Sequence, residues 1–328
     1  MEESRKREKR KKRILSWLFR VAVAAGFLFY LIFSGRLDLR IFFEREIRLE
    51  FVAFALLLYT LTNIKGIIRW QILLKAVNVK LSFFSALRLT YVGNIFSIML
   101  PGVVGGDAVK ALILHREKGE RFSVALTSAL GDRVLGTLAM LAVILFVAPF
   151  LHISSVKSQT LTLITIFFTI FTASFLLFLF APWIEEPLKR LFVRLPWRRF
   201  SLRVLFASFK LRRRFLHSLF AFLLSIPAHL LSVIAVFFLL KAISLDAPFL
   251  PLTYAVLVAL LLEAIPISIA GLGVGEQAFD WLFSLLFVGE VSVIGAEVAL
   301  LMHITRIASS VPGLFFLFWK EKKEPQEL

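Results

Sequence analysis

The sequence SFFSALRLTYVGNIFSIMLPGVVGGDAVKALILH, residues 82–115, is an apolar stretch interrupted by proline and glycine near its centre. Pro101 removes a helical hydrogen bond, and the glycines that follow it loosen the backbone. Residues 250–288 have the same character, because Pro266 is followed by the sequence GLGVGE at residues 271–276. The pattern predicts two helical hairpins, each made of two helices joined by a break.

The composition places these hairpins in a membrane. Apolar residues make up 59 % of the 328-residue chain, and 36 residues are phenylalanine. Soluble domains carry about 45–50 % apolar residues, and a soluble fold could not cover the excess. Composition therefore excludes a soluble enzyme and a disordered protein, and zero cysteines exclude a disulfide scaffold. Within a bilayer, irregular backbone must be covered by protein or line a watery cavity, so both hairpins are predicted to be re-entrant.

Uninterrupted apolar segments predict the spanning helices. About six segments reach the roughly 20 residues that a crossing needs. They are Ile14–Phe33, Leu49–Leu74, Phe122–Leu151, Thr160–Ala181, Leu216–Leu240 and Ala296–Trp319. The predicted fold is all-α: a polytopic helix bundle forming one transmembrane domain over residues 14–319.

Basic residues orient this bundle. The chain has 39 Lys and Arg against 22 Asp and Glu, a net charge of +17. They concentrate at the edges of apolar blocks, in residues 1–13, 182–215 and 320–328, which indicates a membrane surface rather than a nucleic-acid partner. We expect these three segments to be cytoplasmic, with both termini on that side of the plasma membrane. The first hairpin then enters from the cytoplasm and the second from outside.

Part of the basic loop interleaves charge with aromatic and aliphatic residues. Over residues 189–214 this pattern favours an amphipathic helix on anionic lipid, although a solvated linker is the alternative.

The surroundings of the two breaks resemble each other. Each break is followed by an acid, Asp107 or Glu276, and then by a predicted spanning helix that contains an arginine, Arg133 or Arg306. Two such units entering from opposite faces suggest an inverted repeat. Paired interrupted helices are a pointer to a transporter's site near the bilayer midplane. The alternative is that Pro-Gly breaks are simply common in long membrane proteins.

The two arginines are the strongest site candidates. By helical rise Arg133 lies about 16 Å, and Arg306 about 14 Å, into its predicted helix, close to the middle of the bilayer. A charge at that depth costs at least about 2.5–3.5 kcal/mol and needs a partner or a cavity. Arginine's planar fork suits phosphate, and helix N-termini after the glycine runs add positive dipole ends. The residues predict an anion site suited to a lipid phosphate.

Other polar residues complete the candidate site. They are Arg69, Asn94, Asp107, Lys110, Asp132, Glu263 and Glu276. Asp132 and Arg133 are adjacent and point about 100° apart on a helix, so we expect Asp132 to face Arg306 and Arg133 to face Glu276. A purely structural ion-pair network is the alternative.

Two further features concern protons. Glu276 and Asp280 are four residues apart on one predicted helix face, where like charges repel, so they form a candidate proton-coupling pair. His303 lies one turn before Arg306 and is either a site residue or a helix–helix hydrogen bond. The other four histidines show no ligand spacing, and we expect neither a metal nor a cofactor. Nucleotide, zinc-hydrolase and serine-hydrolase motifs are missing from the sequence.

Taken together, these motifs resemble the lysylphosphatidylglycerol synthase transmembrane-region family of flippase-like membrane proteins. The matching residues are Arg69-Trp70, Asn94, Leu100-Pro101-Gly102 with Gly105-Gly106-Asp107 and Lys110, Asp132-Arg133, Pro266 with residues 271–276, Arg306, and Pro312-Gly313. Asp132 stands where the family usually has glutamate, and Lys110 where it commonly has arginine.

The resemblance implies a translocator of lipid between leaflets. In the best-understood members this region moves aminoacylated phosphatidylglycerol and is fused to a soluble transferase domain, whereas other relatives accompany glycosyltransferases. Because this chain ends at Leu328, shortly after its last predicted helix, we do not expect it to synthesise a lipid. The expected substrate is a phospholipid or a polyprenyl-linked lipid. The alternative is a membrane enzyme, or an accessory subunit of a separate lipid-modifying or glycosyl transferase.

Overall fold

The computed structural model describes residues 29–30, 32–33, 40, 46–99, 104–151, 159, 162, 165–166, 169–170, 214–265, 268 and 271–318. Over these residues the chain is helical, with turns and short irregular links but no strand, which confirms the all-α prediction. The predicted spans 14–33 and 160–181 lie largely outside the described residues, as does the basic segment 189–214 except its last residue.

Four described helical stretches are long and apolar enough to cross a membrane. They contain α3 (Leu49–Ala76), α6 (Phe122–Val147, followed by the 3-10 turn Ala148–Phe150), α10 (Phe215–Ala242), and α13 (Gly295–Ser310) with α14 (Pro312–Phe318). The first three agree with the predicted spans. The last was predicted as one helix over 296–319 but is interrupted at Val311, because Pro312 has no N–H to continue the helical ladder.

Both predicted hairpins are helix–break–helix units. The first consists of α4 (Phe83–Met99) and α5 (Val104–Lys118), and the second of α11 (Phe249–Glu263) and α12 (Val274–Leu286). A short 3-10 turn, Gly289–Val293, links α12 to α13. The two helices of each hairpin pack against each other.

Glycine permits the tight packing of the first hairpin. A Cβ on Gly106 of α5 would overlap the carbonyl of Gly93 and the hydroxyl of Ser97, both on α4. The backbones of α4 and α5 are therefore in close contact where these glycines meet.

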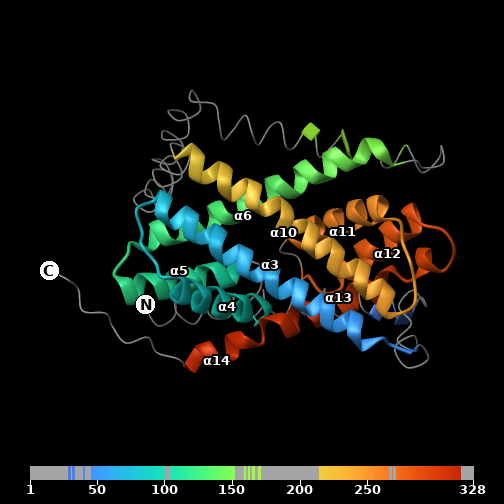
Figure 1. The fold of residues 1–328 in the computed structure, drawn as a ribbon, viewed down its shortest axis with the longest axis horizontal. Helices are drawn as coiled ribbons and strands as arrows, with labels where there is room; N and C mark the ends of the chain where they lie inside the picture. The colour runs from blue at the N-terminus through green and yellow to red at the C-terminus, as the bar shows by residue number, and fades with distance from the viewer. Residues whose placement is uncertain are drawn as a thin grey trace, which may run out of the picture.

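Helices α3 and α10 run antiparallel and form the most extensive helix pair (Figure 1). The start of α3 lies beside the end of α10, where the Arg48 N–H donates to the Ala242 carbonyl at 2.9 Å. Figure 1 shows the first hairpin at one end of this pair and the second at the opposite end.

The ends of α3 and α10 are built alike. At the end of α3, Asn78 has a φ of 67°, and the Val79 N–H donates to the Leu74 carbonyl at 2.9 Å. At the end of α10, Ser244 has a φ of 61°, and the Leu245 N–H donates to Leu240 at 3.0 Å. Both are Schellman caps with one residue in the left-handed region.

The sequence around these caps is also repeated. Leu73-Leu74-Lys75-Ala76 closes α3, and Leu239-Leu240-Lys241-Ala242 closes α10. After each cap a linker of equal length, 77–82 or 243–248, leads into the first helix of a hairpin. Two units with the same order of helix, cap, hairpin and helix, set antiparallel, support the inverted repeat.

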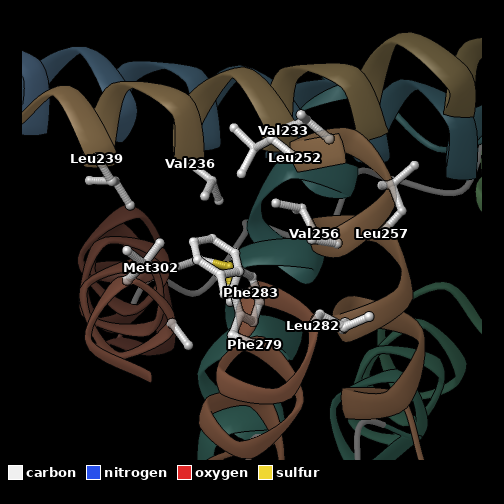
Figure 2. Close-up of a cluster of buried hydrophobic side chains, with 14 of the residues drawn as sticks. Val233, Val236, Leu239, Leu252, Val256, Leu257, Phe279, Leu282, Phe283 and Met302 are labelled. Carbon is white, nitrogen blue, oxygen red and sulfur yellow. The ribbon is translucent and has the colours of Figure 1, made fainter. Parts of the chain in front are cut away.

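Two apolar cores hold the units together. The larger is formed by α3, α6 and α10 to α13, and Figure 2 shows its centre, where Phe279 and Phe283 of α12 lie against Met302 of α13 and Val236 of α10. The smaller surrounds Trp70 and Leu89, which are almost fully buried between α3 and the first hairpin. Each hairpin is thus anchored by its own core.

Candidate functional site

Charged side chains gather in two groups, one for each unit of the repeat. The first cluster consists of Arg69, Asp107, Lys110, Asp132 and Arg133. The second cluster consists of Glu263, Glu276, His303 and Arg306. Each contains the acid that follows a hairpin break and the arginine of the next helix.

A forked ion pair joins α3 to α6 in the first cluster. Arg69 Nε donates to Asp132 Oδ1 at 2.6 Å, and its Nη2 donates to Oδ2 at 2.8 Å. Its third nitrogen, Nη1, donates to the Ser225 hydroxyl on α10 at 2.8 Å. Two parallel bonds to one carboxylate are the strongest geometry available to arginine. This pair therefore fixes three helices at one depth.

Asp107 organises the rest of the first cluster. It lies in the first turn of α5, accepts a hydrogen bond from Arg133 Nε on α6, and lies 3.5 Å from Lys110 Nζ. The Lys110 ammonium also sits over the Trp70 ring, 4.1 Å from its centroid. A desolvated cation gains from the negative face of indole as well as from the carboxylate. Lys110 is therefore held in place from two sides.

The second cluster is centred on Glu263, at the end of α11. Its Oε2 accepts a hydrogen bond from Arg306 Nη1 at 2.8 Å, and its Oε1 lies 3.5 Å from His303 Nε2. The other ring nitrogen of His303 is 3.0 Å from Glu276 Oε1. Glu276 Oε2 accepts the Gly273 N–H at 2.6 Å and so caps α12 at its N-terminus. The break, α11 and α13 are thus tied together by carboxylates.

Two glycines leave room for the charged side chains of the two clusters. A Cβ on Gly136 would lie 2.9 Å from Arg69 Nη1, and one on Gly275 would lie 2.6 Å from Glu263 Oε1. Larger residues at these positions would push against the charged groups. The glycines are therefore part of the site.

Asn63 connects the two units near the centre of α3. It accepts a weak hydrogen bond from Asn94 Nδ2 on α4 at 3.4 Å and donates to the Ser309 hydroxyl on α13 at 3.3 Å. Arg69 lies about 9 Å further along the same helix by its rise per residue. Asn94, a predicted site residue, therefore lies between the clusters and joins neither.

The structure corrects the predicted ion-pair partners. Asp132 pairs with Arg69 rather than Arg306, and Arg133 pairs with Asp107 rather than Glu276. The prediction required the two units to exchange partners, whereas each arginine finds a carboxylate within its own unit. Spacing along single helices could not show which helices lie side by side.

In the candidate proton-coupling pair of Glu276 and Asp280, the structure gives Glu276 hydrogen-bond partners other than Asp280. Both Glu276 oxygens have partners, His303 and the Gly273 N–H, and neither partner is Asp280. Asp280 is buried one turn further along α12. Coupling through these two acids remains a prediction.

Sequence reasoning undervalued His303, whose ring lies between two carboxylates and is 4 % exposed. Its position one turn before Arg306 was the only signal available. Ser225 was missed altogether, since a helix serine normally bonds its own backbone and gives no sign of a distant partner. Among the described residues, no group of three or more His, Asp and Glu could hold a metal ion.

The two predicted phosphate ligands are the more exposed members of their pairs. The side chains of Arg133 and Arg306 are 33 % and 39 % exposed, against 12 % for Asp107 and 5 % for Glu263. The carboxylates therefore lie inward and each guanidinium lies partly at the surface.

These features define a polytopic helical membrane protein with two interrupted hairpins and a charged cluster at each. The sequence profile described as "Lysylphosphatidylglycerol synthase TM region" matches residues 17–313, so the chain belongs to that family. The family assignment predicted from the motifs is confirmed.

One curated relative is a UPF0104 membrane protein of Pyrococcus horikoshii. It is 25 % identical over 129 residues, which cover 37 % of this chain and 38 % of that protein. The match therefore spans well under half the length of the relative. No solved structure matches the chain significantly.

Proposed function

We propose that this protein moves an anionic lipid between the leaflets of the plasma membrane. The observation that carries the proposal is the pair of partly exposed arginines, Arg133 and Arg306, each beside a hairpin break and each backed by a buried carboxylate. A phosphate that approaches either guanidinium meets a donor that its carboxylate partner holds in a fixed orientation. The hairpins lie at opposite ends of the α3–α10 pair (Figure 1), and we assign one arginine to each side of the membrane on that basis.

The topology of the proposal follows from charge. Both termini lie in the cytoplasm, because the basic segment 1–13 and the lysines Lys320, Lys322 and Lys323 flank the bundle. The basic segment 189–214 then rests on anionic lipid of the cytoplasmic leaflet. A phospholipid or a polyprenyl-linked lipid satisfies the same phosphate chemistry. A separate transferase that supplies or consumes this lipid would be a natural partner.

A scrambling assay tests the proposal. Purified protein is reconstituted in liposomes that contain fluorescently labelled phosphatidylglycerol, and dithionite quenching reports the fraction in the outer leaflet. The wild-type protein should equalise the leaflets, whereas Arg133→Ala and Arg306→Ala should each slow exchange at least tenfold. Arg116→Ala, an exposed arginine on α5 outside both clusters, is the matched control and should match the wild-type rate.

Three results would contradict the proposal. Wild-type protein that leaves the leaflets unmixed for both phosphatidylglycerol and a labelled polyprenyl phosphate would reject transport. Unchanged exchange in both arginine variants would reject the site. A lipid product of altered mass, found by mass spectrometry, would favour the enzyme alternative instead.

A further inference from the structure

His303 sits between two carboxylates in the second cluster. Its Nδ1 is 3.0 Å from Glu276 Oε1, and its Nε2 is 3.5 Å from Glu263 Oε1. The ring is buried, and so are both acids, at 4 %, 5 % and 0 % exposure for His303, Glu263 and Glu276. Water has little access to these atoms, so their hydrogen bonds must be made within the group.

If His303 is neutral, the contacts of its two ring nitrogens lack one proton. Nδ1 must carry a hydrogen, because its partner is a carboxylate oxygen that can only accept. Neutral imidazole has one N–H, so Nε2 would then present a lone pair to Glu263 Oε1, which is also an acceptor. Neither atom has a hydrogen-bond partner among the described residues. Two buried, facing acceptors are costly, and one proton placed between them removes the cost.

The charges of the second cluster also indicate that the group binds one added proton. Two carboxylates, Glu263 and Glu276, face a single permanent cation, Arg306. One added proton makes the group neutral, as a low-dielectric interior requires. Tyr59 of α3 lies within electrostatic reach of Glu263 and Arg306.

Other ionisable groups on the packed helices have different partners. Arg88 of α4 pairs with Glu117, and Lys241 of α10 pairs with Asp246. On α12, Asp280 is buried one turn beyond Glu276. The added proton of the second cluster is therefore taken up from outside the cluster.

We propose that His303, Glu263 and Glu276 form a proton-binding site that controls whether Arg306 is available to an anionic headgroup. With the proton in place, Glu263 shares its charge with imidazolium and holds Arg306 less tightly. Without it, the cluster carries an excess negative charge that clamps Arg306 and repels phosphate. The coupling to lipid rests on the proposed function, but the proton site itself does not. Lipid binding should therefore weaken as pH rises.

Histidine NMR tests the proton site without any lipid. The full chain contains five histidines, so isotope labelling of histidine in detergent micelles gives few signals. The signal lost in His303→Gln identifies the residue, and if that variant does not fold, removing the other four one at a time identifies it by elimination. At pH 7.5 we expect both ring nitrogens of His303 to be protonated. Neutral His303 at this pH would overturn the proposal.

A second titration tests the coupling. Dioctanoyl-phosphatidylglycerol should raise the pH at which His303 loses its proton, and its affinity should fall about tenfold per pH unit above that point if one proton is linked. His303→Gln should flatten this profile, and His217→Gln should not. Lipid that binds without moving the His303 titration would overturn the coupling. Failure of wild-type protein to bind lipid at any pH would count against the proposed function and leave the proton site standing on the first spectrum.

Discussion

The ion pair between Arg69 and Asp132 offers the sharpest test of the packing. Asp132→Ala removes the acceptor of two hydrogen bonds, at 2.6 and 2.8 Å, from a guanidinium whose side chain is 15 % exposed. Ser225 would still accept from Nη1, but Nε and Nη2 would be left without their acceptor. The variant therefore strands a buried charge rather than deleting a mere contact.

The size of the effect follows from that burial. Breaking a buried pair by removing one partner costs about 3–5 kcal/mol, so the ratio of folded to unfolded protein should fall by about a hundredfold or more. Asp246→Ala is the matched control, because its pair with Lys241 has side chains that are 71 % and 35 % exposed. An exposed pair of that kind is worth about 0–1 kcal/mol.

Unfolding by SDS in mixed micelles, followed by the fluorescence of the six tryptophans, measures the free energy of unfolding. The double variant Arg69→Met with Asp132→Leu should recover most of the loss, because it removes both charges together. Stability of Asp132→Ala within about 1 kcal/mol of wild type would contradict a stabilising role of the buried ion pair. So would a double variant that is no better than the single one, since the stranded charge would then not be the cause.

Glycine substitutions give two further predictions. Gly106→Ala should destabilise by about 1–3 kcal/mol, because its Cβ overlaps the backbone of Gly93, whereas Gly66→Ala, with nothing within 4 Å, should be neutral or stabilising in the same SDS unfolding experiment. The added Cβ of Gly275→Ala meets the movable carboxylate end of Glu263. The variant should therefore lose more binding free energy for dioctanoyl-phosphatidylglycerol, measured by calorimetry, than free energy of unfolding. Equal losses in Gly106→Ala and Gly66→Ala, or unchanged affinity in Gly275→Ala, would contradict these expectations.

Much of the architecture could be predicted because it depends on local physics. Length and hydropathy give the spans over α3, α6 and α10 to within a few residues at each end. Proline and glycine within an apolar stretch give the breaks of both hairpins, since these residues act on their own backbone. The break at Val311 was missed because Pro312 lies at the end of an otherwise apolar segment.

The sequence did not correctly predict the contacts that side chains make with neighbouring helices. The residue types of the candidate site were chosen correctly as charged groups in apolar surroundings, but their partners were not. Asp132 and Arg133 are neighbours in the chain, yet one faces α3 and the other faces α5. Helical geometry sets the angle between two side chains, whereas only packing decides which helix stands in each direction.

Solvent preference and backbone chemistry act residue by residue, so the amino-acid sequence is enough to predict a membrane-embedded helix bundle with two interrupted hairpins. The repeat is also visible in the sequence, in the two LLKA segments that close α3 and α10. The tertiary structure was needed to show that each arginine pairs with a carboxylate of its own unit, and that His303 completes a buried group of two carboxylates and one arginine. Electrostatic energy depends on distance through space, and sequence separation does not set that distance.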